Sequence, residues 1–514
     1  MPIVRIPNAG AVGMIRDLSQ HELPMNAWSD VRNGRFLDGY AWQFYGYGQV
    51  YGTPSVVPYH LVPVNLADGT RYWIYAGLAA IHGVTVTAGS AVHTDLTSGT
   101  WGPTAGTITS TVLSGIPILN DGTNAPLSWD LNTANNFVTL ANWPAGVTCK
   151  AMRSFRNFLV AMGVTEAGTY YPYMIRTSHP ADPGVVPASW DYTDTARDTL
   201  RFDLAPSTSP IIDGCQLRDA LMVYTEKEVF RLDFVGGQFV TKAEKVLGTS
   251  GAMNRNCIVE IDGYQIVLTS SDVIIHDGQS AHSILDKRTR RWLFQNIDVD
   301  YKHLCFVFRH PFFNEAYICF PSVGSTSCDK AIVYNFTDKT CSARDLPNIY
   351  HAAEGPIDNG LAGNWNQDSA PWSSDLTMWN GPDYVPSTTR VLMGGTGPKL
   401  YMLDASADFD GSLPTAYFER RGLSFDIPEQ RKLVREVRPR ITGNTGDTVT
   451  VSVGWQDDPW DEPTYTDRTH TIGTTVSNSF LVDGRYIAIK FSSGTAYQWR
   501  LDSYDVEVEP AGPY

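Results

Sequence analysis

The stretch "GYQIVLTSSDVIIHDG", residues 263–278, shows the pattern that decides the fold. Two short apolar runs are joined by polar turn residues, and Ile266 and Leu268 fall on the same side of the first run. A period of two is typical of a half-buried strand, and two such runs around a turn predict a β-hairpin.

The same hairpin pattern recurs along most of the chain, at 71–85, 219–234, 315–336 and 390–405, and less regularly at 116–130 and 156–178. Within 219–234, Val229, Leu232 and Phe234 show the alternation again. A recurrence over a stretch too long for one sandwich suggests blades arranged around an axis. We therefore predict that residues 53–405 form a β-propeller of six to eight blades. Two consecutive β-sandwiches are the alternative.

The pattern changes near residue 406. Runs at 447–455, 484–491 and 499–509 alternate cleanly, and "NTGD" at 444–447 is a good hairpin turn. We predict a C-terminal β-sandwich platform domain over 406–514 that folds by itself from residue 413. The linker 406–412 is then expected to be open to proteolysis. The only helical turns expected lie within 284–297.

Composition supports an all-β protein of more than one domain. The chain has 514 residues, and a single core stops growing at about 250–300. Gly 44 and Pro 31 are spread evenly, as many turns require, and only 18% of residues are charged. No signal pattern and no apolar run long enough for a membrane span is found. Seven cysteines without CxxC are typical of small buried residues in a protein made in a reducing cytoplasm.

The formal net charge is −15, which argues against a surface that grips nucleic acid. Known motifs for chemistry are also missing: we find no dinucleotide turn, no GxSxG and no HExxH, and the histidines lack metal-ligand spacing. "DASADFDGS" at 404–412 lacks the later Gly and Glu of a calcium loop and is interpreted as a solvated linker. We expect no catalytic, cofactor or metal site, although paired carboxylates for glycoside cleavage stay open because the fold sets their pairing.

The N-terminal stretch "WSDVRNGRFLDGYAWQFYGYGQVYG", residues 28–52, is rich in aromatics and glycine. It is either the opening strands of an all-β domain or, as we predict for 1–52, an arm that docks on a neighbouring subunit. A basic segment at 419–440 is either a solvated face or a docking site for an acidic neighbour. From these two regions the candidate interface residues are Trp28, Arg32, Arg35, Trp42, Arg420, Arg421, Arg431, Lys432 and Arg435.

A long loop at 354–390 carries three tryptophans and little strand pattern. Structureless loops of this length are usually functional or disordered, and aromatics on loops are contact anchors. We predict that Trp365, Trp372 and Trp379 make contacts at the tip of the molecule. Folding back over the propeller face is the alternative.

Several stretches, in order, resemble the tail nozzle proteins of short-tailed bacteriophages. They lie at 23–52, 120–130, 155–191 and 276–284 and in the ending "GRYIAIKF…WRLDSYDVEVEPAGPY". The resemblance covers nearly the whole chain, although none of the stretches is a strict motif. It implies a non-enzymatic propeller with an added β platform, in which the aromatic stretch threads between subunits or completes the platform sheet.

The resemblance also implies partners and a location. Six copies would form a homohexameric ring below the portal and adaptor, contacting tail fibre or spike proteins. The ring would extend the channel through which genomic DNA passes without specific binding. The chain would be made in the host cytoplasm and reside in the virion tail, with possible contact to the host surface. The alternatives are a carbohydrate- or receptor-binding virion protein and a propeller glycosidase.

Overall fold

Tight two-residue turns shape several of the predicted hairpins. Asp262 and Gly263 join β22 (Ile258–Ile261) to β23 (Tyr264–Leu268), and both residues have positive φ, 48° and 84°. Such type I′ turns match the right-handed twist of paired strands, and they favour Asp followed by Gly. The turn therefore sets the register of the hairpin whose sequence pattern is described above.

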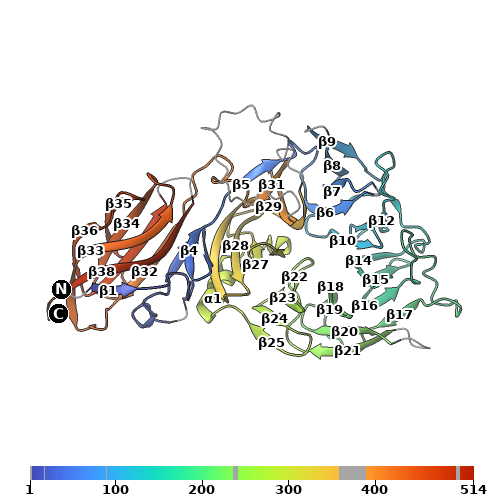
Figure 1. The fold of residues 1–514 in the computed structure, drawn as a ribbon. Coiled ribbons are helices and arrows are strands. Elements are labelled where there is room, and N and C mark those ends of the chain that lie inside the picture. The colour runs from blue at the N-terminus through green and yellow to red at the C-terminus, as the bar shows by residue number, and fades with distance from the viewer. Residues whose placement is uncertain are drawn as a thin grey trace.

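The computed structural model describes residues 3–16, 18–66, 68–87, 90–235, 241–357, 389–493 and 498–513. These residues form an all-β protein with two parts, a β-propeller and a β-sandwich (Figure 1). Both chain ends lie in the sandwich, at the side away from the propeller. The tryptophans Trp365, Trp372 and Trp379 lie outside the described residues.

The described residues of the propeller form seven blades. The first two blades contain β6 (His60–Asn65), β7 (Arg71–Ala76), β8 (Ile81–Thr87) and β9 (Ser90–Asp95), then β10 (Thr109–Leu113), β11 (Ile116–Asn120), β12 (Leu127–Ser128) and β13 (Val138–Thr139). The third contains β14 (Thr148–Phe155), β15 (Phe158–Glu166), β16 (Thr169–Thr177) and β17 (Leu200–Asp203). The fourth contains β18 (Ile211–Leu217), β19 (Ala220–Thr225), β20 (Val229–Phe234) and β21 (Thr241–Leu247). The fifth combines β22 and β23 with β24 (Val273–His276) and β25 (Ala281–Ser283).

The last two blades share one long strand. Blade six contains β26 (Phe306–His310), β27 (Glu315–Phe320), β28 (Cys328–Asn335) and the first half of β29 (Thr340–Pro356). The second half of β29 pairs with β30 (Thr389–Gly395) and becomes the innermost strand of blade seven, which continues to β31 (Lys399–Leu403). The pairing shifts at Ile349, so the change of blade falls on a β-bulge.

An N-terminal strand closes the ring. β5 (Tyr47–Val50) pairs with β31, with Tyr47 opposite Leu403 and Val50 opposite Leu400, and is the outermost strand of blade seven. The inner strands β29 and β6 also lie against each other, which joins the last blade to the first. A closed ring of blades has no long exposed sheet edge. The alternative of two consecutive sandwiches is therefore wrong.

The second part is a sandwich of two antiparallel sheets. One sheet contains β3 (Gly34–Leu37), β4 (Tyr40–Gln43), β38 (Trp499–Pro513), β33 (Gln430–Gly443) and β36 (Asn478–Gly484), with β1 (Ile3–Ile6) paired to β38. The other contains β2 (Asp30–Arg32), β32 (Tyr417–Leu423), β37 (Tyr486–Ser493), β34 (Thr448–Gln456) and β35 (Thr464–Thr471). The core between the sheets holds N-terminal residues such as Trp28 and Phe36 beside C-terminal ones such as Phe418 and Phe491.

Two expectations about domains are therefore corrected. Residues 1–52 are not a separate arm, because β1 to β4 complete the sandwich and β5 completes the propeller. Of the two roles implied for this stretch, the structure shows the one in which it completes a sheet. Residues 413–514 also do not form a whole domain by themselves, since their apolar face is covered by Ile6, Trp28 and Phe36. The propeller is inserted between the two segments that build the sandwich.

One α-helix and two short 3-10 turns interrupt the described strands. α1 (Lys287–Asn296) begins at Asp286, whose side chain accepts bonds from the backbone amides of Arg288 and Thr289. Its length exceeds the one or two turns predicted for this region. The 3-10 turns are η1 (Gln20–Glu22) and η2 (Lys302–Leu304).

Candidate functional site

The joint between the two parts contains a cluster of buried charges. Arg35 on β3 donates from Nη2 to Asp404 Oδ2 at 2.6 Å and to Glu315 Oε2 at 3.1 Å. Arg344 on β29 donates from Nη1 to Asp404 Oδ1 and to the Tyr317 hydroxyl, both at 2.8 Å. None of these five side chains is more than 3% exposed. A sandwich arginine thus enters the propeller and is held there by two carboxylates.

The cluster balances two guanidinium groups against two carboxylates. Burial by itself raises the pKa of Asp404, but the charges of Arg344 and Arg35 hold it far below its ordinary value. Burial raises the pKa of Glu315 above its ordinary value, although Arg35 and the Tyr317 hydroxyl both donate to its carboxylate. The Arg35 guanidinium also lies 3.6 Å from the ring centre of Phe313. A set of charges this deeply buried is stable only when each partner is present.

Asp404 corrects the interpretation of 404–412 as a solvated linker. The residue is 3% exposed, and the segment after it is bonded to the N-terminal chain, with Gly46 donating to the Ser406 carbonyl at 2.7 Å. Because both acids of the cluster are bonded to arginines and covered by the sandwich, neither is placed to protonate a glycosidic oxygen. The cluster is therefore a buried network of ion pairs that connects the sandwich to the propeller, and we call it the latch.

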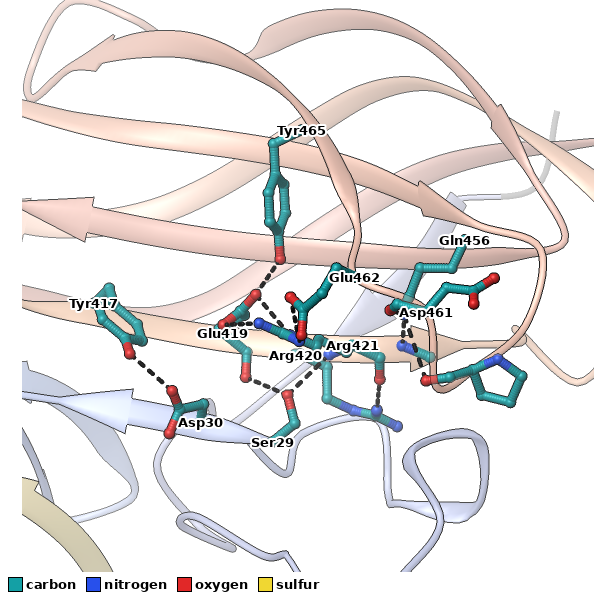
Figure 2. Close-up of polar contacts among 12 residues, drawn as sticks. Ser29, Asp30, Tyr417, Glu419, Arg420, Arg421, Gln456, Asp461, Glu462 and Tyr465 are labelled. Carbon is teal, nitrogen blue, oxygen red and sulfur yellow. Dashed lines mark hydrogen bonds and ion pairs between the residues drawn. The ribbon is translucent and has the colours of Figure 1, made fainter.

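Arg421 of the basic segment 419–440 pairs on the surface of the sandwich. Figure 2 shows its guanidinium between two carboxylates. Nε donates to Glu419 Oε1 at 2.8 Å, and Nη1 donates to both oxygens of Glu462 at 2.9 Å. The Tyr465 hydroxyl also bonds to Glu419. Arg421 reaches solvent, but its charge is already matched within the chain.

Arg420 points the opposite way, into the N-terminal segment (Figure 2). Its guanidinium donates to the backbone carbonyls of Gln20 at 2.6 Å and Leu23 at 2.8 Å, and also to that of Arg421. Burial lowers the pKa of Arg420 to about 10. The side chain is 1% exposed, so the prediction that it contacts another subunit is wrong. It ties the turn around η1 to β32.

Three further candidates are buried within the chain, and their prediction as interface contacts is corrected. Trp28 donates from its indole to the Ala9 carbonyl at 2.6 Å and packs in the sandwich core. Lys432 bonds to the Arg485 carbonyl, and burial lowers its pKa to about 8. Arg35 belongs to the joint cluster described above. Period-two alternation places residues on a strand face, but it does not say which face another sheet covers.

The remaining candidates reach the surface, in most cases within ion pairs. Arg431 bonds to Asp483 at 2.9 Å and Asp457 at 3.0 Å, and Arg435 bonds to Glu509 at 2.7 Å. The pairing continues along β33 and β38 from Arg438 to Glu436 and Glu507 and from Arg440 to Asp505. Arg32 bonds to Asp345 at 2.7 Å, and Trp42 is half-buried under Arg500. The arginines of the basic segment that reach the surface are therefore matched by carboxylates, whereas Arg420 and Lys432 bond to backbone carbonyls.

A second basic run, "KRTRR" at 287–291, lies in α1 at the joint. Arg288 donates to the Leu18 carbonyl at 3.2 Å and lies 5.4 Å from the ring centre of Trp460, while Arg290 pairs with Asp272 at 2.8 Å. Arg16 of the sandwich lies over Trp292 of the helix. These contacts are a second connection between sandwich and propeller.

The joint residues were missed by reasoning from the sequence. Glu315, Arg344 and Asp404 come from three separate strands or strand ends, and no spacing rule connects them with Arg35. A carboxylate directly after an apolar strand, as in "LYMLDA" at 400–405, was the available sign. Within the described ranges, no group of three or more His, Cys, Asp or Glu side chains is placed to hold a metal ion. The helices among those residues include none that is long and apolar enough to span a membrane.

No family model and no curated protein matches this chain. Among solved structures, the extracellular domain of the one component system BT4673 from B. thetaiotaomicron is 9% identical, with a TM-score of 0.43 over 89% of this chain. This chain spans 59% of the length of that structure. YCF48 bound to D1 peptide is 9% identical, with a TM-score of 0.38 over 70% of this chain and 94% of its own. An exo-β-1,3-galactanase from Phanerochaete chrysosporium is 10% identical, with a TM-score of 0.25 over 88% of this chain and 100% of its own.

Proposed function

We propose that this chain is a structural virion protein without catalytic activity, the tail nozzle of a short-tailed bacteriophage. The support is the ordered resemblance from 23–52 to the C-terminal stretch, together with the two-part architecture of propeller and β platform. In this proposal six copies form a ring that meets the adaptor and extends the DNA channel. The buried latch at Arg35 and Asp404 suits a ring subunit, because it holds the two parts of each wall segment together.

The interface in this proposal rests on the candidates that reach the surface. Arg32, Arg421, Arg431 and Arg435 are each paired, so a neighbouring subunit would meet a surface of alternating charge. Such surfaces contribute specificity and register more than affinity. Exchanging the signs of one pair, as Arg435→Glu with Glu509→Arg, keeps the pair within the chain but changes the pattern offered to a neighbour.

Electron microscopy of the purified protein, alone and with its adaptor, tests the proposal. We expect a six-fold ring with an open channel, and we expect the double variant Arg435→Glu, Glu509→Arg to fold but to form fewer rings. A protein that stays monomeric with its adaptor at high concentration contradicts the proposal.

The conduit role also predicts weak contact with DNA. The net charge is −15, and the arginines of 431–440 that reach the surface are matched by carboxylates. A wall of like charge lets the duplex slide, whereas each neutralised phosphate would add about 0.9 to the salt slope of binding. We expect no measurable duplex binding at moderate salt in a fluorescence anisotropy assay. Tight, salt-sensitive binding would contradict a conduit.

A second candidate is a carbohydrate- or receptor-binding virion protein. It is favoured by Trp455 and Trp460, which are 40% and 58% exposed on the sandwich. Exposed indoles offer flat faces that stack on sugars or on a partner protein. A trimer in place of a hexamer, with tryptophan fluorescence quenched by host glycans, would support this candidate over the nozzle.

A further inference from the structure

A small cavity lies on the propeller axis, at the end where the innermost strands begin. Its walls come from the segments that lead into β6, β10, β22 and β26 and from β29, and include Tyr59, His60, Arg255, Asn256, His303 and Tyr350. The cavity has a volume of about 20 Å³, which is enough for a water molecule or one polar group of a ligand. Five blades therefore contribute to one site that no motif in the sequence indicates.

The carboxylate of Asp213, next to the cavity wall at Asn256, is fully used by other groups. Asp213 accepts bonds from Arg153 Nε at 2.8 Å and Nη2 at 2.6 Å, and from the backbone amides of Gly214 at 2.8 Å and Asn256 at 2.9 Å. An ionised carboxylate has about four acceptor positions, so these four bonds fill them. Arg153 is thereby neutralised, and Asp213 has no position left for a second arginine.

Arg255 is that second arginine, and it makes no ion pair among the described residues, although the charge of Asp213 attracts it. Its Nε is buried in the cavity wall without a hydrogen-bond partner, and no ion pair to it is found in that part of the chain. Burial lowers the pKa of Arg255, yet an arginine side chain stays charged at any ordinary pH. Arg255 is only partly exposed and its buried Nε has no partner, so the site gains a hydrogen bond and an ion pair when an anion enters.

The other groups around the cavity do not supply that anion. His60 and His351 lie with ring centres 4.0 Å apart. Burial lowers the pKa of His60 well below its ordinary value and that of His351 to about 3, so both rings are neutral at pH 7. Tyr59 and Tyr350 stack with centres 4.1 Å apart and are half-buried, which leaves aromatic surface at the mouth. The site therefore combines the Arg255 guanidinium, which has no ion-pair partner among the described residues, with two neutral imidazole rings and the stacked rings of Tyr59 and Tyr350.

We propose that this axial cavity binds an oxyanion, the carboxylate or phosphate group of a small ligand, through the guanidinium of Arg255. The planar fork of arginine matches both groups with two parallel hydrogen bonds. Asn256 and His303 line the same wall and add further polar groups to it. The rest of the ligand extends past the stacked tyrosines toward solvent. This site is independent of the nozzle proposal.

Thermal unfolding of the full chain tests the site, with acetate, glucuronate and inorganic phosphate titrated at constant ionic strength against sodium chloride. We expect a saturable rise of the melting temperature with at least one of the three anions. Acetate or glucuronate alone would identify a carboxylate ligand, and phosphate alone a phosphate ligand. In Arg255→Gln the apparent affinity should fall at least tenfold, while Arg197→Gln, which removes an exposed arginine near Asp194, should bind like the parent chain.

A crystal soaked with selenate gives a second readout that does not depend on a variant. We expect anomalous density for selenium within hydrogen-bond reach of the Arg255 guanidinium. In the absence of anion, Arg255→Gln should also be no less stable than the parent chain, because it removes a charge that lacks a partner. The proposal is overturned if no anion stabilises the chain beyond chloride, or if Arg255→Gln binds as tightly as the parent chain.

Discussion

At the scale of single residues, Asp404 shows how one side chain can join two domains. Its carboxylate accepts hydrogen bonds from Arg344 of the propeller and Arg35 of the sandwich, and the residue is buried. In such a place the attraction between charges is strong, and so is the penalty for leaving one of them alone. The latch therefore depends on all of its members.

Asp404→Asn should lower the free energy of unfolding by about 3–5 kcal/mol, because two buried arginines then share one carboxylate. Urea unfolding followed by tryptophan fluorescence measures the loss. The matched control is Glu509→Gln, which breaks the surface pair with Arg435 and should cost no more than about 1 kcal/mol. Equal losses in the two variants would show that the joint is not a latch.

His276 links two neighbouring blades through a chain of hydrogen bonds. Gly278 donates to its Nδ1 at 3.2 Å, so Nε2 carries the proton and donates to the Tyr224 hydroxyl at 2.6 Å. That hydroxyl then donates to Gln265 at 2.5 Å. A second proton on the ring would sit on Nδ1 and point at the Gly278 N–H, so the charged form of His276 would lose that hydrogen bond. Burial accordingly lowers the pKa of His276 to about 4.

The low pKa predicts a loss of stability in acid. The unfolded chain binds a proton near pH 6.5 and the folded chain only near pH 4, so stability is full above 6.5 and falls between these values. The full span corresponds to about 3 kcal/mol. Denaturation series at pH 7, 5.5 and 4.5 should show this slope, and His276→Gln should reduce it, while the buried His60 and His351 keep part of it. The exposed His282→Gln serves as the control. A slope unchanged in His276→Gln would refute this assignment.

At the scale of elements, the position of β5 shows why the ring needs the N-terminal segment. β5 pairs with β31, and Gly46 before it lies against the segment 404–412. A Cβ on Gly46 would lie 1.5 Å from the Asp408 carbonyl oxygen, a distance at which the backbone has to move. Glycine here allows the closing strand and the linker to cross.

Gly46→Ala should therefore destabilise the chain by about 3 kcal/mol and loosen β5 before the other blades. Hydrogen exchange should show reduced protection of 47–50 and 400–403. Gly397→Ala is the control, because a Cβ there meets nothing within 4 Å and the residue lies in the turn between β30 and β31. Protection at 47–50 that is equal in both variants would contradict the crossing as the cause.

At the scale of the whole molecule, the chain crosses between the two parts twice. β1 pairs with β38, so the two ends of the chain lie in one sheet (Figure 1). Removing residues 1–50 would therefore not leave the propeller intact. Such a truncation removes part of the sandwich core, the Arg35 latch and the closing strand together.

The interleaved sandwich predicts the behaviour of fragments. Residues 413–514 alone should lack a cooperative unfolding transition, because the face that Trp28 and Phe36 cover would be open to water. Joining residues 1–44 by a short flexible linker to 412–514 should restore the transition, measured by circular dichroism. The joined fragment carrying Trp28→Ala should lose several kcal/mol of that stability. A stable fold of 413–514 alone would contradict this architecture.

The sequence by itself determined the local structure. Alternation at Ile266 and Leu268, and the turn at Asp262 and Gly263, depend on neighbours a few residues away, so the hairpins and the all-β class were predictable. The range of six to eight blades followed from counting hairpins, and the described residues of the propeller form seven. The resemblance to tail nozzle proteins likewise rests on the sequence alone and stays a proposal.

Only the tertiary structure decided what each strand faces and which charges are matched. β5 pairs with a strand some 350 residues away, and Arg35 meets Glu315 and Asp404 at similar separations. Patterns within a few residues of sequence cannot predict such pairings, because the burial of a side chain depends on which distant sheet covers its strand face. For the same reason Arg420 and Arg421, adjacent in sequence, have opposite surroundings: one lies among backbone carbonyls in the core, and the other lies between carboxylates at the surface.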